Sequence, residues 1–390
     1  MDEIRNPFAP GAGSQPPELA GRGEIIRDAD IALQRALRGR HAQSLMLLGL
    51  RGTGKTVLLN RFEELAISHD MQSSFIEAPD DSSLEELLYP RMHQVLRKLS
   101  LVESAKEQAF KAMRGLRSFA SAFKIKIGDV SIAVDPAAGV ADSGSLEQDL
   151  TEMFVLIGQA AQAAGTGWVL LIDEVQYLSD RELPAVIVAM HRLNQLNLPV
   201  VFFGAGLPQL AALSGNAKSY AERLFNFSTI GPLDADAARM AVQQPIEEEE
   251  ESIESDALDR ILLETSGYPY FLQEWAYQSW NAADESPISL DDVKEAAANA
   301  ERRLDDSFFR VRLDRLTPKE RDYAIAMARL GQGPYRSADV AEQLGESVQS
   351  LGPRRAQIIS KGMIYSPAHG DVDFTVPTFD AFLRRVYPEE

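Results

Sequence analysis

The sequence contains no cysteine, which excludes disulfide bonds, thiolate nucleophiles, iron–sulfur clusters and zinc sites with cysteine ligands. Histidine is scarce, and its positions lack the spacing of a metal site. The histidines are His41, His69, His93, His191 and His369. We therefore expect no metal cage built from histidine and cysteine.

Long hydrophobic runs and an excess of positive charge are also missing. No run approaches the roughly 20 apolar residues that cross a bilayer, and the acidic, Pro- and Gly-rich start is unlike a signal peptide. The chain has 39 Lys and Arg against 58 Asp and Glu, a net charge of −19. This balance disfavours broad attraction to nucleic acid or anionic lipid. We expect a cytoplasmic protein with no membrane partner.

What the chain does have is length for about two or three domains and a glycine-rich octet. Residues 49–56 read GLRGTGKT, the pattern G-x-x-x-x-G-K-[ST]. Here the glycines turn backbone N–H groups toward a phosphate chain, the lysine reaches the β- and γ-phosphates, and the hydroxyl holds Mg²⁺. An apolar strand over 44–49 and an amphipathic helix over 55–69 flank it. The predicted phosphate-site residues are Gly49, Gly52, Thr53, Gly54, Lys55 and Thr56.

A second acidic motif supports the phosphate site. Residues 168–178, WVLLIDEVQYL, form an apolar strand that ends in Asp173 and Glu174. A strand that brings Asp173 beside the glycine loop orients Mg²⁺ through water, and Glu174 then positions the water that attacks the γ-phosphate. We predict Asp173 and Thr56 as the metal residues, and Lys55 and Glu174 as catalytic residues.

Further apolar runs predict the fold class. Residues 73–79, 198–206 and 227–233 read as strands that alternate with helical stretches. Alternation of this kind predicts an α/β fold, a parallel sheet with helices on both faces, and ligands at the carboxyl edge of the strands. Both motifs stand at such edges.

These motifs resemble those of P-loop ATPases that carry an additional strand between the two motifs. From about residue 17 the chain is most similar to bacterial AAA-type ATPases related to the origin-recognition and replication-initiator class and to the STAND switch ATPases. The resemblance implies ATP and Mg²⁺ as cofactors and hydrolysis of ATP to ADP and phosphate.

Short segments outside the phosphate site extend the resemblance. ELAGRGEII (18–26) resembles the box that wraps adenine, with Gly21 and Arg22 matching it. SYAERLFNFSTIGPL (219–233) resembles the segment of the arginine finger, which makes Arg223 the finger residue, acting in a neighbouring subunit of a homo-oligomer. A surface salt bridge is the alternative for Arg223. ETSGYPYFLQ (264–273) resembles the G-x-P motif of the STAND lid, with Gly267 and Pro269.

The chain also departs from this family pattern. The G-x-P segment lacks the second sensor arginine that AAA+ proteins often carry, and the strand over 198–206 ends without the usual polar sensor, leaving Gln209 as the candidate. These departures imply incomplete sensing of the γ-phosphate, which suits a slow switch better than a processive motor.

An island of positive charge lies over residues 111–134, within a predicted insertion over 105–145. The basic residues of 111–134 are Lys111, Arg114, Arg117, Lys124 and Lys126, and residues 123–134 alternate around Gly128-Asp129 as a hairpin does. The first three recur at every third residue and share a helix face. We expect contact with nucleic acid or an acidic partner; the alternative is a solvated helix face.

The last residues predict a separate winged-helix domain. Helices beginning at a Thr317–Glu320 capping box, at 337 and at 347 precede a strand–turn–strand over 363–376. The third helix would present Arg354, Arg355 and Lys361 to double-stranded DNA. Residues 316–390 hold nine basic and ten acidic side chains, so docking of a protein partner is the alternative.

The predicted organisation is a flexible segment over 1–16, an ATPase core over 17–233, a helical lid over 234–312 and the winged helix over 313–390. The first functional hypothesis is a switch that binds and hydrolyses ATP and whose lid angle sets how the winged helix meets its partner. The alternatives are an oligomeric DNA-associated ATPase of the initiator or transposition-regulator kind, and a transcription regulator whose nucleotide site only stabilises the fold.

Overall fold

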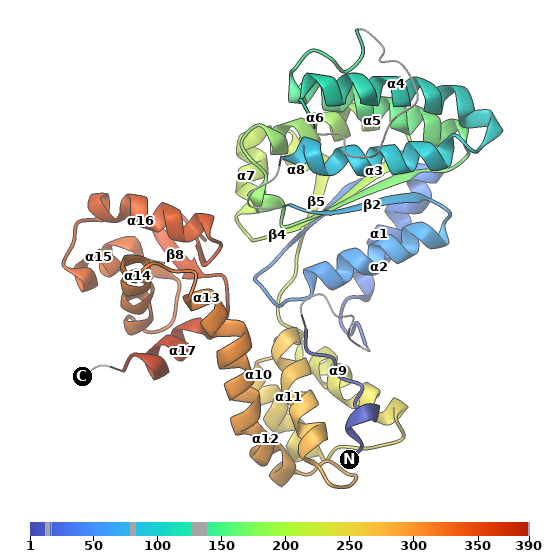
Figure 1. The fold of residues 1–390 in the computed structure, drawn as a ribbon. Helices are drawn as coiled ribbons and strands as arrows, with labels where there is room; N and C mark the ends of the chain where they lie inside the picture. Colours follow the sequence, from blue (N-terminus) through green and yellow to red (C-terminus); the bar gives the residue numbers. More distant parts are fainter. Residues whose placement is uncertain (12–15, 17, 79–82, 126–138, 389–390) are drawn as a thin grey trace.

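The computed structural model describes residues 1–11, 16, 18–78, 83–125 and 139–388. Figure 1 shows a core built around a sheet, a bundle of helices beneath it, and a C-terminal domain to one side, coloured orange to red. Within the described residues no helix has the length and apolar character needed to cross a membrane.

The core contains a five-stranded parallel sheet in the order β2-β3-β4-β1-β5. Its strands are β1 Ser44–Leu48, β2 Gln72–Glu77, β3 Trp168–Asp173, β4 Val200–Gly206 and β5 Phe225–Thr229. Alternate side chains enter different apolar clusters: Leu45 and Leu47 pack on one face, Met46 and Leu48 on the other. Because both faces are buried, the strands read as continuous apolar runs.

Helices cover both faces of the sheet, as predicted. On one face lie α1 Gly23–Leu37 and α2 Lys55–Ser68; on the other lie α3 Leu84–Leu99, α5 Leu146–Ala163 and α6 Glu182–Gln195. Helix α4 Lys106–Ala122 packs outside α3 and α5. Shorter helices complete the core: η2 Glu103–Ala105, η3 Val175–Tyr177, α7 Leu210–Ala217 and α8 Ala221–Leu224. Most of the hairpin predicted over 123–134 lies outside the described residues.

The lid is a bundle of α9 Ala235–Glu248, α10 Ser255–Thr265, α11 Pro269–Ala282 and α12 Leu290–Arg303. The π-helix η4 Leu304–Arg310 and the single turn α13 Val311–Leu313 lead from it to the C-terminal domain. Lid and C-terminal domain share one apolar cluster, in which the rings of Phe309 and Phe382 stack 5.2 Å apart.

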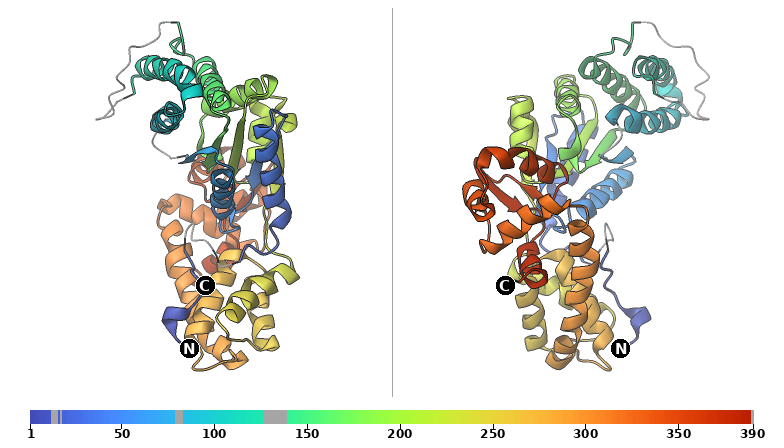
Figure 2. Two further views of the ribbon diagram at one scale, coloured as in Figure 1. Left: turned by 90° about the vertical axis from the view of Figure 1, so that its right-hand side faces the viewer. Right: turned by 60° about the vertical axis from the view of Figure 1, so that its left-hand side comes forward.

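The N-terminal residues pack on the lid, a finding that differs from the flexible segment expected over 1–16. The helix η1 Glu3–Arg5 lies beside the lid helices in both views of Figure 2. Phe8 is 2% exposed in the lid cluster, and Asn6 Nδ2 donates to Tyr277 O at 3.0 Å and to Asn281 Oδ1 at 2.7 Å. An amide and an aromatic ring thus anchor a stretch whose composition suggested disorder.

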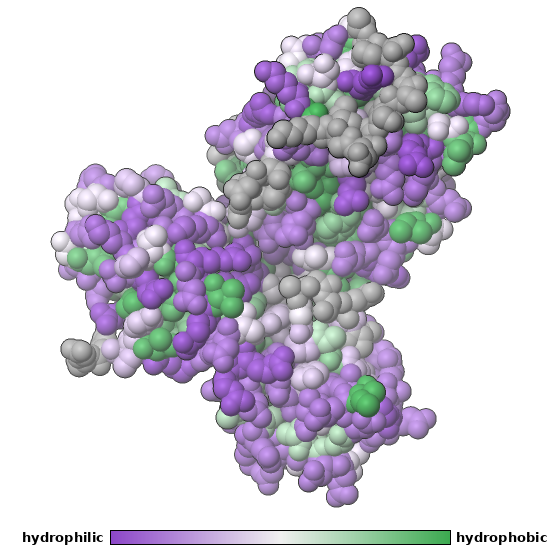
Figure 3. All heavy atoms as spheres, viewed as in Figure 1, coloured by the Kyte–Doolittle hydropathy of each residue, from purple (hydrophilic) through white to green (hydrophobic). Residues whose placement is uncertain are grey.

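The C-terminal domain contains α14 Pro318–Arg329, α15 Ser337–Leu344, α16 Val348–Ser360 and α17 Phe379–Val386. Its antiparallel sheet has the order β6-β8-β7, from β6 Tyr335–Arg336, β8 Asp371–Phe374 and β7 Ile364–Tyr365. Thr317 and Glu320 form the predicted capping box. The space-filling view in Figure 3 shows a mostly hydrophilic face over this domain, with apolar residues in small groups.

Candidate functional site

The loop between β1 and α2 has the backbone that its glycines allow. Gly52 has φ +83° and Gly54, the residue before α2, has φ +91°, a region that other residues rarely adopt. A side chain on Gly49 would clash with the carbonyl oxygen of Ile230. The loop therefore leads directly into α2, whose N-terminus carries partial positive charge and favours an anion.

Lys55 is buried at the first position of α2, with 7% of its surface exposed. Its Nζ donates to Leu50 O at 2.9 Å. Burial lowers the pKa of Lys55, Glu174 and Asp173 oppose that shift, and Arg51 adds to it. The buried amine is thus a desolvated cation at the loop. A bound phosphate would offset the free-energy cost of burying its charge.

Thr56 and Asp173 form an oxygen pair at the carboxyl edge of the sheet. Thr56 Oγ1 donates to Asp173 Oδ2 at 2.6 Å. Asp173 is 4% exposed, and burial raises its pKa while the Thr56 hydrogen bond acts against the rise. A hydroxyl and a carboxylate are ligands that Mg²⁺ accepts together with phosphate oxygens. These residues fit the metal predicted from the sequence.

Glu174 follows Asp173 with a left-handed φ of +53°. Its Oε1 lies 3.6 Å from Arg51 Nη1, and its Oε2 accepts a hydrogen bond from Gln176 Nε2. Gln176 Oε1 accepts in turn from Leu207 N at 3.0 Å, just beyond β4. Gln176 therefore links the end of β4 to Glu174. The sequence suggested Gln209 as the polar sensor residue at the end of this strand.

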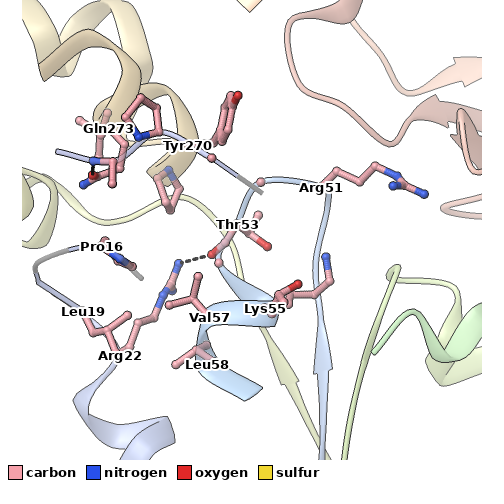
Figure 4. Close-up of a pocket in the computed structure, with 18 of the residues that line it drawn as sticks. Pro16, Leu19, Arg22, Arg51, Thr53, Lys55, Val57, Leu58, Tyr270 and Gln273 are labelled. Carbon is pink, nitrogen blue, oxygen red and sulfur yellow. Dashed lines mark hydrogen bonds between the residues drawn. The ribbon is translucent and has the colours of Figure 1, made fainter. Parts of the chain in front are cut away.

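A cavity of about 560 Å³ joins these groups. Its lining comes from the N-terminal segment, the core, the lid and the segment before the C-terminal domain. Of the predicted site residues it includes Arg22, Gly52, Thr53, Gly54, Lys55, Thr56, Asp173, Glu174 and Pro269. Residues as far apart in sequence as Arg22 and Tyr270 thus meet in one place (Figure 4).

The cavity lining also includes the apolar residues Pro10, Leu19, Leu233 and Leu272. Arg22 joins the 18–26 segment to the phosphate loop, because its Nη2 donates to Gly231 O at 2.5 Å and to Thr53 O at 3.4 Å, the bond drawn in Figure 4. Burial lowers the pKa of Arg22, opposed by Asp234. Apolar lining residues together with a cationic loop suit a planar base that carries phosphates.

Gly21 lies at the contact of core and lid rather than in the cavity wall. It has φ +69°, and a Cβ there would lie 2.8 Å from the Ala237 Cβ of α9. The close approach explains the need for glycine in the 18–26 segment.

Arg312 on α13 is a cavity residue that the sequence analysis missed. Its guanidinium lies 4.1 Å from the centroid of the Phe308 ring and donates to Phe308 O. Burial lowers the pKa of Arg312 to about 10, and the nearby cations Arg51 and Arg315 contribute. The cluster of arginines after Phe308-Phe309 was the available signal, but only the fold shows which one enters the cavity.

Arg223 does not line the cavity. It is exposed on α8, and it makes no ion pair with any residue that the structure describes. Such a position leaves its guanidinium available to another subunit.

The predicted contact residues of the C-terminal domain make bonds within the domain. Arg354 pairs with Glu346 at 3.0 Å, and Arg355 Nη2 donates to Ser366 Oγ at 2.9 Å and Asp371 O at 3.0 Å. Lys361 Nζ donates to Glu320 Oε2 at 2.6 Å and to Arg315 O at 3.0 Å. The outward positions of α16 include Gly352, Pro353, Ala356 and Gln357, which carry no charge.

The basic residues of the insertion lie on and after α4. Lys111, Arg114 and Lys124 are exposed, and Arg117 is partly buried. Lys126 lies outside the described residues. The exposed Phe110 accompanies them, so α4 presents a positive face with one aromatic ring.

Comparisons with known proteins agree with this architecture. Residues 18–203 match the model of an AAA ATPase domain, and residues 306–383 match a domain of unknown function (DUF8462). A search of curated proteins finds no match to the chain.

Among solved structures, the chain resembles the Walker-type ATPase PABY2304 of Pyrococcus abyssi, with a TM-score of 0.59 and 15% identity over 94% of this chain and 96% of that chain. It is also similar to ORC1 of Aeropyrum pernix in complex with DNA (TM-score 0.48, 14% identity, 98% and 96% coverage). A third is the RuvB Holliday junction branch migration motor of Thermotoga maritima (0.45, 14%, 97% and 100%). The first likeness shows a shared fold, and the predicted P-loop fold class is confirmed.

Proposed function

We propose that the chain, whose residues 18–203 match an AAA ATPase domain, is a slow ATP-driven switch whose C-terminal domain is a winged helix that binds a protein partner. In this proposal Mg-ATP lies in the cavity between core and lid. Hydrolysis changes how the lid and the C-terminal domain sit on the core.

The observation that carries the proposal is the make-up of the cavity wall. Lys55 and Glu174 come from the core, Tyr270 from the lid, and Arg312 from the segment that enters the C-terminal domain. A triphosphate that contacts all of them favours one arrangement of the three parts, and a diphosphate holds that arrangement less firmly.

Each residue has a role that follows from its chemistry. Lys55 binds the β- and γ-phosphates, and Arg312 approaches the γ-phosphate from the opposite wall. Thr56 and Asp173 would hold Mg²⁺, which neutralises phosphate charge when bound. Glu174 orients water and accepts its proton.

A protein partner suits the C-terminal domain better than DNA. The order α14-β6-α15-α16-β7-β8 supports the proposed winged helix. Arg354, Arg355 and Lys361 are engaged within the domain, however, and the outward residues of α16 are neutral. A DNA reader needs basic groups free to contact phosphates.

Glu174→Gln and Lys55→Ala test the proposal. We expect Glu174→Gln to lose hydrolysis by about 100-fold or more, yet to bind ATP as the wild type does, because the amide cannot accept the proton. Lys55→Ala should lose ATP binding in calorimetry, whereas Lys98→Ala, exposed on α3, should behave as the wild type. Unchanged turnover of Glu174→Gln, or unchanged ATP binding by Lys55→Ala, would contradict the ATPase site.

The partner is sought with the trapped form. Glu174→Gln loaded with ATP is used to retain proteins from the cell extract of its source organism, and Lys55→Ala serves as the control without nucleotide. A protein held by the first and not by the second supports the switch. Retention that is equal with both variants contradicts it.

A second candidate is a DNA-associated assembly, favoured by the positive face of α4. Lys111 and Arg114 are exposed on a chain of net charge −19. If this face contacts DNA, Lys111→Glu with Arg114→Glu should remove salt-sensitive retention of duplex DNA. The absence of retention by the wild type at low salt, with and without ATP, would exclude this candidate.

A further inference from the structure

Arg51, the loop residue before Gly52, contacts both the ATPase site and the C-terminal domain. Its Nη1 lies 3.6 Å from Glu174 Oε1, and its Nη2 donates to the Tyr177 hydroxyl at 2.7 Å. Its main-chain N–H donates to Thr375 O at 3.0 Å. In Figure 4 the Arg51 side chain points away from Lys55 and toward the pale red strands of the C-terminal domain.

The C-terminal domain meets Arg51 through a glycine. Gly362 has φ +64°, and a Cβ there would clash with the Tyr177 hydroxyl and lie 2.7 Å from Arg51 Nη2. Thr375, which is fully buried, donates from Oγ1 to Gly362 O at 2.7 Å. Gly362 and Thr375 therefore form one unit that fits closely against Arg51 and Tyr177.

The same contact engages Glu174. Arg51 faces one oxygen of its carboxylate, and the Gln176 amide donates to the other. A general base has to orient a water molecule and accept its proton. A carboxylate with one oxygen paired with a guanidinium and the other accepting a hydrogen bond is poorly placed to do so.

We propose that Arg51 is a positioning residue for Glu174 and that the C-terminal domain controls it. With the domain seated on Arg51 and Tyr177, Glu174 stays paired with Arg51 and hydrolysis is slow. When the domain moves away from the core, Arg51 loses its contacts with Gly362 and Thr375. The Glu174 carboxylate can then orient a water molecule for hydrolysis. The inference rests on the proposed ATPase switch and describes its coupling: a partner that holds the domain in the lifted position speeds hydrolysis.

A matched pair of glycine variants tests the contact. Gly362 and Gly345 have nearly the same backbone, φ +64° and +65°, but only a Cβ at Gly362 meets other atoms within 4 Å. Both Gly→Ala variants thus carry similar backbone strain. We expect Gly362→Ala to raise kcat about threefold or more over Gly345→Ala, with little change in the KM for ATP. Equal kcat values for the two variants would overturn the proposal.

Arg51 variants give an independent test of the proposal, because Arg51 lies outside the C-terminal domain. Arg51→Met keeps the main-chain N–H and removes the guanidinium. We expect it to raise kcat as Gly362→Ala does, and Gly362→Ala added to Arg51→Met to give no further rise. Arg51→Lys keeps a positive charge beside Glu174 and should raise kcat less than Arg51→Met does. A lower kcat with a raised KM in Arg51→Met would mean that Arg51 only binds nucleotide, and would also overturn the proposal.

Docking is measured apart from activity. The chain lacks cysteine, so dyes on Ser68→Cys of α2 and Ser360→Cys of α16 report the distance between core and C-terminal domain. We expect lower energy transfer in Gly362→Ala than in Gly345→Ala, with the fold checked by circular dichroism; equal transfer contradicts the inference. If the wild type hydrolyses no ATP, the proposed function has failed. If Glu174→Gln stops turnover while the glycine pair stays equal, only this inference has failed.

Discussion

The Thr56 hydroxyl donates to the Asp173 carboxylate at 2.6 Å, joining the first turn of α2 to the end of β3 across 117 positions of sequence. Helix and strand belong to different motifs, and the parallel order of the sheet brings them together. A hydroxyl and a carboxylate at this edge of the sheet are ligands that a divalent cation accompanying a triphosphate accepts.

The first prediction concerns Mg²⁺. Asp173→Asn keeps the size of the side chain but removes its charge, so we expect the Mg²⁺-dependent part of ATP affinity to fall about tenfold or more. Affinity measured in EDTA should stay close to that of the wild type. Calorimetry with and without Mg²⁺ separates the two. Asp180→Asn, exposed beyond β3, is the control. Equal losses in Mg²⁺ and EDTA would mean that Asp173 acts on the fold and not on the metal.

The sheet and the phosphate site could be predicted because their signals are local. The glycine octet, its flanking strand and its helix lie within residues 44–69, and continuous apolar strands follow from burial on both faces. Asp173 was predictable because it ends such a strand. In each case residues close together in the sequence determine the local backbone geometry.

Arg312, the Gly362 contact and the packing of the N-terminal segment could not be predicted in this way. Arg312 is one of several arginines near the end of the lid, and it follows a π-helix and lines the cavity. Gly362 follows α16, and no local pattern indicates its contact with Arg51 and Tyr177. Phe8 is a single aromatic residue in a Pro- and Gly-rich stretch, and no pattern identifies the lid as its partner. Each of these depends on the packing of distant segments.

The second prediction concerns Arg312. A hydrogen bond to a charged group contributes about 1.5–3 kcal/mol, so Arg312→Ala should weaken ATP binding by roughly ten- to a hundredfold. ADP affinity should change much less, because the γ-phosphate is missing. Arg312→Lys should restore part of the difference. Arg310→Ala, whose side chain is 57% exposed, is the control. Equal loss of ATP and ADP affinity in competition assays would mean that Arg312 does not contact the γ-phosphate.

The third prediction separates structure from recognition in α16. Arg355 ties α16 to the turn between β7 and β8 through two bonds, so Arg355→Ala should lower the unfolding midpoint by a few degrees. Gln357→Ala, exposed two residues further along α16, should leave the midpoint unchanged. Thermal unfolding by circular dichroism measures both. A stable Arg355→Ala variant that has lost duplex DNA retention would instead favour a direct DNA contact.

The last prediction concerns Arg223, which is exposed on α8 and outside its own cavity. If it stabilises phosphoryl charge in a neighbouring subunit, Arg223→Ala should lose turnover but keep ATP binding. Glu174→Gln should also lose turnover, because its amide cannot accept the proton of the attacking water. Mixing the two variants creates some sites with an intact Glu174 from the first subunit and an intact Arg223 from the second, so activity should return in the mixture.

Sizing with a slowly hydrolysed ATP analogue should then show an assembly larger than one chain. Arg192→Ala, on α6 of the same core, serves as the control and should retain full turnover by itself. If each variant stays inactive in the mixture while the analogue does drive assembly, Arg223 does not act across subunits. If Arg223→Ala hydrolyses ATP as the wild type does, its side chain has no part in the reaction. Complementation requires both a shared site and an exposed arginine, which is why it decides between these readings more sharply than a single variant does.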